Sequence, residues 1–445
     1  MPEQNPLREM VTKRKLGIHC GIPSFCSANK LVIEAILEQA QRFDERVVIE
    51  ATSNQVNQNG GYMRMQPKDF CDYVYQIADR IGFSHDKILI GGDHLGPLPW
   101  ADKPAAEAMD NAETLVRLSV AAGYKKIHLD TSMKLGDDPV DERLSDETIA
   151  ERGARLYKAC EEEYQKLLER NPDEMHPVFV IGSEVPIPGG NQKKEDDVEV
   201  TRPEDFERTL VAYHKVFAQY GLADAFQHII AIVVQPGVEF GNLSVHAYDR
   251  VEAAKLCQSL KKYPDIVFEG HSTDYQSPKK LKEMVEDGIA IIKVGPALTY
   301  AMREALYSLA MIEDELIPDD TQRSHYREIL EGKMLEDPTY WKKYYKGDEN
   351  SVAIQRRYGF SDRSRYYTAL PDVENAMNKL FANLDQVSIP TGILHQYMPM
   401  QYIKVRDGAL SPKARDLAKY SIVAMVEDYN YAAKVNYMFG GFSIG

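Results

Sequence analysis

The segment KILIGGDH, residues 87–94, joins a short apolar run to an Asp-His pair at its end. A nearly continuous apolar run of this length is typical of a strand that is covered on both faces. Such a strand needs no polar residue at its end in order to fold, so the Asp-His pair indicates a functional position. Runs of the same kind recur through the first two-thirds of the chain, at residues 16–20, 47–53, 126–132, 178–184, 228–235, 266–271 and 289–295.

Helical patterns separate these runs, at residues 31–43, 67–81, 105–122, 146–168, 203–220, 248–262 and 278–286. Alternation of strand and helix repeated in this way predicts the α/β class and a (β/α)8 TIM barrel, in which the strands end on one shared face. An open, doubly wound parallel sheet is the alternative. It is disfavoured because no G-x-G-x-x-G sequence follows any of the runs.

The strand pattern stops at about residue 301, and the rest of the chain reads as helices. We expect a barrel over residues 1–300 and a helical extension over residues 301–445 that packs on the barrel, because no Gly/Ser-rich or Pro-rich linker separates the two. The extension is rich in Tyr and Arg at residues 355–358 and 363–367. These side chains can close the pocket, contact a neighbouring subunit, or simply form a solvated helix face.

Composition narrows the classes of partner. The net charge of −15 argues against nucleic acid or an anionic membrane surface as a partner bound through bulk charge. The apolar runs fall short of the about 20 residues that a membrane span requires, and the first 14 residues lack the apolar stretch of a signal peptide. The five cysteines show no C-x-x-C spacing. We therefore expect a cytoplasmic protein with free thiols.

The strand ends predict a metal site. His94 and His271, with Glu184 between them, would form a set of two histidines and one carboxylate that suits Zn²⁺ or another divalent ion. Gln235 is either a fourth ligand or the cap of a strand end. Asp93 can face the substrate beside the metal; the alternative is a buried Asp-His pair that only shapes a turn.

Other strand ends predict contacts with the substrate. Gly295, followed by Pro at the start of a helix, leaves backbone N–H groups for a phosphate, although an ordinary strand-to-helix turn would look the same. Ser272 and Thr299 can add hydroxyl donors. The remaining candidates, which can orient a metal ligand or hold a sugar hydroxyl, are Glu50, Asn54, Asp130 and Ser132.

Six long motifs resemble the Z subunits of D-tagatose-bisphosphate aldolase, the GatZ/KbaZ family. They are GGDHLGP (91–97), HLDTSM (128–133), SEVPIPGG (183–190), VVQPGVEF (233–240), FEGHSTDYQ (268–276) and KVGPALTYAMREAL (293–306). The resemblance covers essentially the whole chain and implies a distant relation to class II aldolases, which are zinc-dependent barrels. It implies that Asp93 is the acid/base, that His94 and His271 bind the metal, and that residues 293–299 bind phosphate.

The chain departs from the aldolase pattern at two strand ends. Class II aldolases carry a third ligand His at the sixth strand end, where this chain has Gln235, and an Asn at the eighth, where it has Gly295. The resemblance is therefore compatible with two functions of the family. One is a non-catalytic subunit that stabilises a smaller class II aldolase; the other is an enzyme that interconverts D-tagatose 6-phosphate and D-fructose 6-phosphate at carbon 4.

Chemistry favours the enzyme. The hydrogen on C4 of a ketose lies β to the C2 carbonyl and is not acidic, so inversion requires oxidation at C4 or cleavage of the C3–C4 bond. Since no dinucleotide fingerprint exists, we expect retro-aldol chemistry with a metal and a base. The predicted function is a metal-dependent ketohexose-phosphate 4-epimerase, a homo-oligomer, with Asp93 and Glu184 as catalytic carboxylates. The stabilising subunit is the alternative.

Overall fold

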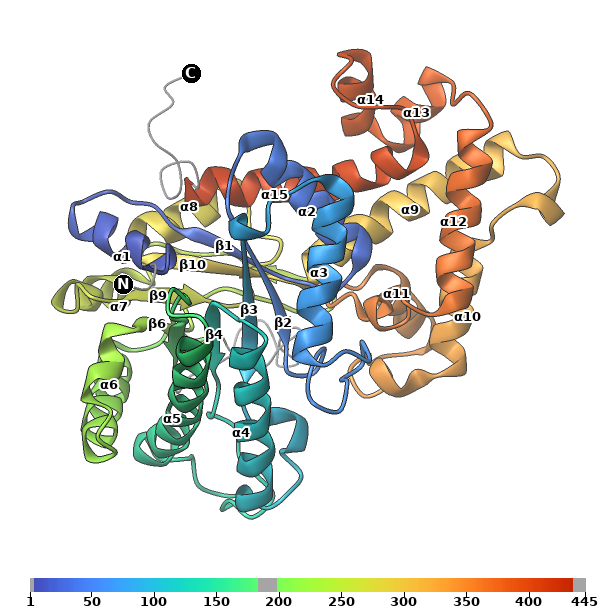
Figure 1. The fold of residues 1–445 in the computed structure, drawn as a ribbon. Helices are drawn as coiled ribbons and strands as arrows, with labels where there is room; N and C mark the ends of the chain where they lie inside the picture. Colours follow the sequence, from blue (N-terminus) through green and yellow to red (C-terminus); the bar gives the residue numbers. More distant parts are fainter. Residues whose placement is uncertain (1–3, 183–197, 435–445) are drawn as a thin grey trace.

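The computed structural model describes residues 4–182 and 198–434, and its central feature is a closed barrel of eight parallel strands (Figure 1). Around the barrel the strands follow the order β1-β10-β9-β6-β5-β4-β3-β2. Their bounds are β1 Ile22–Cys26, β2 Val47–Thr52, β3 Ile88–Leu95, β4 Lys126–Leu129, β5 Val178–Ile181, β6 Ile229–Val234, β9 Val267–Gly270 and β10 Ile289–Val294. The TIM barrel is confirmed, and closure excludes the open sheet.

The helices between the strands agree with the predicted pattern within a few residues. They are α2 Lys30–Phe43, α3 Pro67–Ile81, α4 Ala105–Ala121, α5 Asp146–Arg170, α6 Pro203–Gln219, α7 Ala254–Ser259 and α8 Pro278–Asp287. Local chemistry sets several starts: Asn29 caps α2, and Ser145 and Ser277 cap α5 and α8 with their side chains. The helix predicted at residues 248–262 is shorter, with a 3-10 turn at Leu260–Lys262 following α7.

The first predicted strand is wrong. Residues 16–20 connect helix α1, Leu7–Lys15, to β1, and Leu16 is 73% exposed. The real strand begins six residues later. Its sequence, IPSFC, contains a proline and a serine, so it lacks the continuous apolar character that marks the other strands.

Helix α1 closes the amino-terminal end of the barrel. Leu7, Met10 and Val11 are buried with inward-facing strand residues such as Val48 and Leu89 in one apolar cluster. Apolar side chains therefore fill the amino-terminal end of the barrel. The polar residues of the interior lie toward the carboxyl-terminal end.

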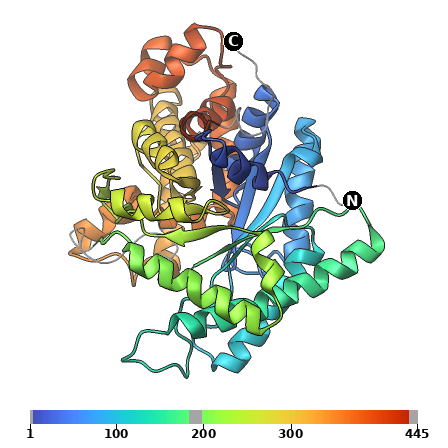
Figure 2. The same cartoon turned by 90° about the vertical axis from the view of Figure 1, so that its left-hand side faces the viewer.

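The C-terminal part is helical, as predicted for the extension. Its helices are α9 Pro296–Leu316, α10 Tyr326–Glu336, α11 Glu349–Tyr358, α12 Pro371–Asp385, α13 Thr391–Tyr397, α14 Pro399–Arg406 and α15 Ala414–Ala433. The boundary expected at residue 300 falls inside α9, which runs unbroken from the barrel into the extension. Figure 2 shows the C-terminal helices gathered on one side of the barrel.

The last helix returns to the barrel wall. Helix α15 packs against α2, α8 and α9 and also contacts β1 and β10. The N–H of Gly21 donates to the carbonyl of Ala433 at 2.8 Å. The extension is thus built into the barrel's outer layer. Among the helices that the structure describes, none combines the length and apolar character needed to cross a membrane.

Candidate metal centre

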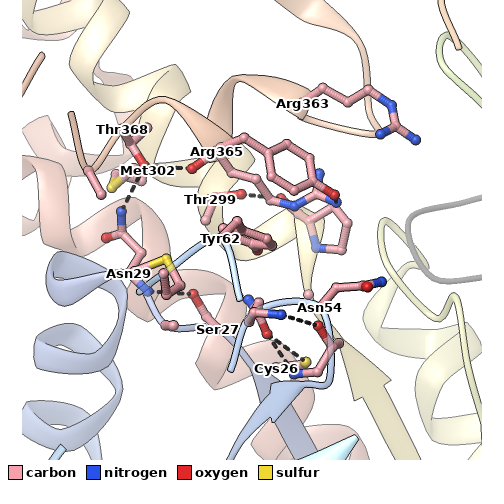
Figure 3. Close-up of a pocket in the computed structure, with 18 of the residues that line it drawn as sticks. Cys26, Ser27, Asn29, Asn54, Tyr62, Thr299, Met302, Arg363, Arg365 and Thr368 are labelled. Carbon is pink, nitrogen blue, oxygen red and sulfur yellow. Dashed lines mark hydrogen bonds between the residues drawn. The ribbon is translucent and has the colours of Figure 1, made fainter. Parts of the chain in front are cut away.

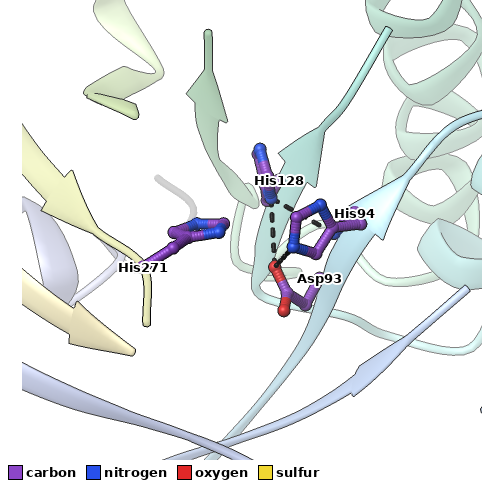
Figure 4. A group of neighbouring side chains, drawn as sticks. All are labelled: Asp93, His94, His128 and His271. Atoms are coloured by element: carbon purple, nitrogen blue, oxygen red, sulfur yellow. Dashed lines mark hydrogen bonds and ion pairs between the residues drawn. The ribbon is translucent and has the colours of Figure 1, made fainter. Parts of the chain in front are cut away.

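Three histidines meet at the carboxyl-terminal end of the barrel (Figure 4). His94 lies at the end of β3, His128 lies in β4, and His271 follows β9. The ring centroids are 4.9 Å apart for His94 and His128, 4.9 Å for His94 and His271, and 5.0 Å for His128 and His271. With Asp93, each of the four offers one ligand atom within 4.8 Å of the others, and all four are buried. This is the donor set of a compact divalent-metal site.

An irregularity in β3 lets two consecutive residues face the same centre. The register between β3 and β4 shifts between Gly92 and Leu95, and His94 adopts a left-handed conformation with φ 49°. In a regular strand Asp93 and His94 would point to opposite faces. A left-handed backbone is uncommon and strained for a residue with a Cβ, and such strain concentrates at functional sites.

Glycine at position 96 is needed for the same geometry. A Cβ there would lie 1.8 Å from the carbonyl oxygen of Asp130, so only glycine allows the end of β3 to approach the end of β4. That approach brings Asp130 to His94: Oδ2 of Asp130 lies 2.8 Å from Nδ1 of His94. The Ser132 hydroxyl donates to the other carboxylate oxygen of Asp130 at 2.7 Å.

Carboxylates from outside the four-residue cluster orient two of the three imidazoles. Asp130 holds Nδ1 of His94, and Glu269 Oε1 lies 2.9 Å from Nε2 of His271. The nitrogens left for a metal are Nε2 of His94 and Nδ1 of His271. Metal-binding histidines commonly use their second nitrogen in this way, which fixes the tautomer and the ring orientation.

His128 supplies the strongest sign of a metal. Its Nδ1 lies 3.0 Å from Oδ1 of Asp93, and the backbone N–H of His94 points at the same nitrogen from 3.1 Å. The tautomer in which Nδ1–H donates to Asp93 leaves Nε2 with the lone pair that a metal needs. The Nε2 of His128 is buried and has no hydrogen-bond partner in the described part of the chain. A buried, unpaired nitrogen is unfavourable, and ligation of a cation would satisfy it. The residues present therefore fit a divalent ion.

Below the histidines, the barrel holds a network of buried ion pairs. Nζ of Lys126 lies 2.8 Å from both Glu50 Oε1 and Glu269 Oε2. Lys293 pairs with Glu50, and its Nζ lies 2.9 Å from Oδ1 of Asp93. No side chain of this network is more than 5% exposed. Asp93 therefore joins the ionic network to the histidines.

This network sets the protonation of the site. Burial opposes ionisation of Asp93, but the charges of His94 and Lys293 outweigh it and hold its pKa well below the usual range. Burial also opposes a charge on His94, yet Asp93 and Asp130 together raise the pKa of that imidazole. Burial lowers the pKa of His271 to about 4. His271 is thus neutral near pH 7 and able to ligate, whereas a metal at His94 has to compete with a proton.

A cavity of about 600 Å³ opens above the metal centre. Asp93, His94, His271 and Lys293 form part of its wall. Of the residues predicted to contact substrate, the cavity is lined by Asn54, Ser272, Gly295 and Thr299. The helical extension also contributes to the wall, with Tyr340, Arg363 and Arg365 among its lining residues. Figure 3 labels the two arginines.

Other predicted site residues lie elsewhere. Glu184 falls outside the described residues. Gln235 is not part of the cluster: its Oε1 accepts from the backbone N–H groups of Gly237 at 2.8 Å and Val238 at 3.0 Å, as a strand cap does. Ser132 acts on Asp130 and does not line the cavity. Glu50 belongs to the ionic network and not to the sugar-facing wall.

His128 and Lys293 were missed as individual residues. His128 stands in the middle of the run KIHLD, where the pattern predicts a strand interior, and Lys293 lies in the stretch that the resemblance assigns to phosphate binding. Strand alternation was the available signal, since it places Lys126, His128 and Asp130 on one face. It does not say whether that face looks into the barrel or toward the helices.

Comparison with known proteins gives the family. The family model for the D-tagatose-1,6-bisphosphate aldolase subunit GatZ/KbaZ-like proteins matches residues 7–434. The solved structure of a probable tagatose 6-phosphate kinase from Sinorhizobium meliloti 1021 is 45% identical, with a TM-score of 0.84, over 93% of this chain and 100% of that one. A putative fructose-1,6-bisphosphate aldolase from Coccidioides immitis is 13% identical, with a TM-score of 0.44, over 85% of this chain and 99% of that one. The chain therefore belongs to the D-tagatose-1,6-bisphosphate aldolase subunit GatZ/KbaZ-like family.

Proposed function

We propose that this protein is a metal-dependent ketohexose-phosphate 4-epimerase that interconverts D-tagatose 6-phosphate and D-fructose 6-phosphate. One observation carries the proposal: the buried, unpartnered Nε2 of His128 converges with His94 and His271 beside an ionised Asp93. A subunit with only a stabilising role has no physical need for an unsatisfied nitrogen in its interior.

The proposed reaction breaks and remakes the C3–C4 bond. Removal of the proton on the C4 hydroxyl lets that oxygen become an aldehyde, while the electrons of the C3–C4 bond move to the C2 carbonyl. The products are a dihydroxyacetone enediolate and glyceraldehyde 3-phosphate. Addition of the enediolate to the other face of the aldehyde gives the epimer, and the proton returns to the C4 oxygen. No oxidant or second substrate is required.

His94, His128 and His271 would hold the ion, through Nε2, Nε2 and Nδ1 respectively. When bound, a divalent cation such as Zn²⁺ supplies positive charge that stabilises an enediolate. Asp93 is the proposed base because its carboxylate is ionised and lies beside the cluster. Lys293, 2.9 Å from that carboxylate, keeps it oriented. Glu184 remains the second proposed catalytic carboxylate and a proposed ligand.

The family description favours a second candidate, a non-catalytic subunit of a class II tagatose-bisphosphate aldolase. In that case the protein would co-purify with a smaller aldolase and stabilise it. Phosphoryl transfer, suggested by the name of the Sinorhizobium relative, has less support, because the sequence contains neither a G-x-x-x-x-G-K-[ST] nor a G-x-G-x-x-G phosphate loop. In either remaining role we expect a homo-oligomer, and the five free thiols favour a reducing, cytoplasmic location.

The decisive experiment measures metal content and turnover on the purified protein. Carbon-13 NMR of labelled D-fructose 6-phosphate should show D-tagatose 6-phosphate in the presence of Zn²⁺, Mn²⁺ or Co²⁺, and none after chelation. His395→Ala, at an exposed position of α13, is the matched control for histidine removal and should keep full activity. Absence of turnover with every metal, together with stabilisation of a co-expressed aldolase, would replace the epimerase by the subunit.

A further inference from the structure

The expected phosphate site at the start of α9 is already occupied by a carboxylate of the chain. Oδ1 of Asp274 accepts from the backbone N–H of Gly295 at 3.0 Å and of Ala297 at 2.8 Å. Asp274 is buried, and a phosphate placed at these amides would have to displace it or lie against its charge. The hydroxyl of Thr299 is also engaged, since it donates to Oδ2 of Asp362 at 2.6 Å. The anion of the substrate therefore needs another partner.

Arg365, from the helical extension, offers the required donors. It lines the cavity and forms no ion pair with a carboxylate in residues 4–182 or 198–434. A guanidinium has five N–H donors. Nη1 of Arg365 donates to the backbone carbonyls of Ser361 and Asp362, and Nη2 donates to the Tyr366 hydroxyl at 3.1 Å. Its Nε–H and one Nη2–H have no partner among the described residues, and an oxyanion that accepts from both would make a two-point contact.

Aromatic rings hold this guanidinium in place. It lies over the ring of Tyr366, 4.5 Å from the centroid. The Tyr366 ring in turn packs at 4.6 Å against Tyr62, from the loop after β2, and at 4.6 Å against Tyr340. In the view of Figure 3, Arg365 lies above Tyr62, nearer to the strand ends than Arg363. A side chain fixed in this way loses little entropy when it binds a ligand.

The carboxylate of Asp362, in the same segment as Arg365, is already paired with another arginine. The carboxylate of Asp362 receives Arg303 Nε at 2.7 Å, and it also accepts from Thr299 and Ser364. Arg303 thus has a carboxylate partner, whereas Arg365 has none among the described residues. The contrast matters because a paired guanidinium has little to gain from a phosphate, whereas an unpaired one at a cavity wall gains a charge-assisted contact.

We propose that Arg365 binds the phosphate of the substrate. The assignment rests on the proposed epimerase function. In the retro-aldol reaction the phosphate stays on the three-carbon aldehyde. Arg365 therefore keeps that fragment in the cavity while its carbonyl turns to present the opposite face to the enediolate.

Calorimetric titration of the intact protein tests this directly, because binding is measured whether or not turnover occurs. Arg365→Met should weaken binding of D-fructose 6-phosphate by about 100-fold, as expected for loss of a two-point charged contact. Binding of unphosphorylated D-fructose should not change. The matched control is Lys343→Met, which removes an exposed cation from the same cavity wall and should change binding less than about 3-fold.

Each outcome decides one of the two proposals. Wild-type binding that depends on Arg365 without any epimerisation would leave the phosphate assignment intact and remove the proposed function. Equal binding of D-fructose 6-phosphate by wild type and Arg365→Met, or an equal loss of D-fructose binding in the variant, would overturn the assignment. If Arg365→Met does not fold, Arg365→Lys keeps the charge but not the two-point edge. It should then show an intermediate loss of about 10-fold.

Discussion

The barrel interior contains two neighbouring polar layers that differ in how completely they are paired. In the deeper layer, Lys126 and Lys293 are surrounded by carboxylates that neutralise them. The next layer toward the cavity holds His128 and His271, which follow Lys126 and Glu269 by two residues in the chain. In this layer the buried Nε2 of His128 lacks any partner in the described structure. The residue types give no warning of this difference, since both layers consist of titratable side chains.

The comparison separates a scaffold from a binding site. Buried charges that satisfy one another have little to gain from a ligand, but they are strongly destabilised when one partner is removed. A buried group without a partner is the reverse: it contributes little to folding and gains much from a ligand. Asp93 belongs to both layers, which is why it can be ionised and still face the cavity.

Removal of His128 should have the largest effect on the histidine layer. We expect His128→Ala to lose bound metal and at least about 1000-fold in epimerase activity, since it deletes a ligand at the catalytic centre. Metal analysis and the NMR assay measure both. Gln235→Ala is the matched control at a strand end outside the cluster and should retain its metal. If Gln235→Ala also lost its metal, Gln235 would have to be counted among the metal ligands.

Removal of Lys126 should act on the scaffold layer. Lys126→Met leaves Glu50 and Glu269 without their shared cation, and an unpaired buried charge typically destabilises by about 3–5 kcal/mol. Urea denaturation measures the free energy of unfolding. Lys103→Met, which removes a lysine from an exposed pair with Glu107, should leave it unchanged. Equal stability of the two variants would show that the deeper layer is not the scaffold.

Asp274 provides the contrast of a buried carboxylate without a paired cation. Burial raises its pKa to about 6 from 3.8. The native state then binds a proton more tightly than the unfolded state, so this group makes stability fall as pH rises from about 4 to about 6. Asp274→Asn should therefore be more stable than wild type at about pH 8, by up to about 3 kcal/mol, and equally stable at about pH 4. If Asp274→Asn were more stable than wild type by the same amount at both pH values, ionisation of Asp274 would not be the cause.

Asp130 should show the smallest effect, because it acts on the metal only through His94. Asp130→Asn keeps the shape of the side chain but weakens the hold on Nδ1 of His94, and loss of such a partner lowers metal affinity by about 10- to 100-fold. Competition with a chelating dye measures the affinity. Ser132→Ala, one step further from the ring, should lower it less than Asp130→Asn does.

Much of the barrel was predictable because seven of its strands are apolar enough to stand out. The strand at Ile22–Cys26 was missed because Pro23 and Ser24 interrupt the pattern, and residues 16–20 looked more apolar. At the site, Asp93, His94 and His271 were predicted from their places at strand ends, and the structure brings them together. Gln235 occupies an equivalent place, but backbone amides two and three residues away hold its oxygen.

By itself, the sequence determined the barrel, the face on which its polar residues gather, and the chemistry available there. These follow from local patterns of apolar and polar residues along single segments. Only the tertiary structure decided which polar groups remain unpaired. That depends on the bulge in β3, on the approach of Gly96 to Asp130, and on contacts such as Asp274 with the start of α9. Partners joined by closure of the barrel lie far apart in the chain, so no local pattern reports whether His128 or Arg365 has found one.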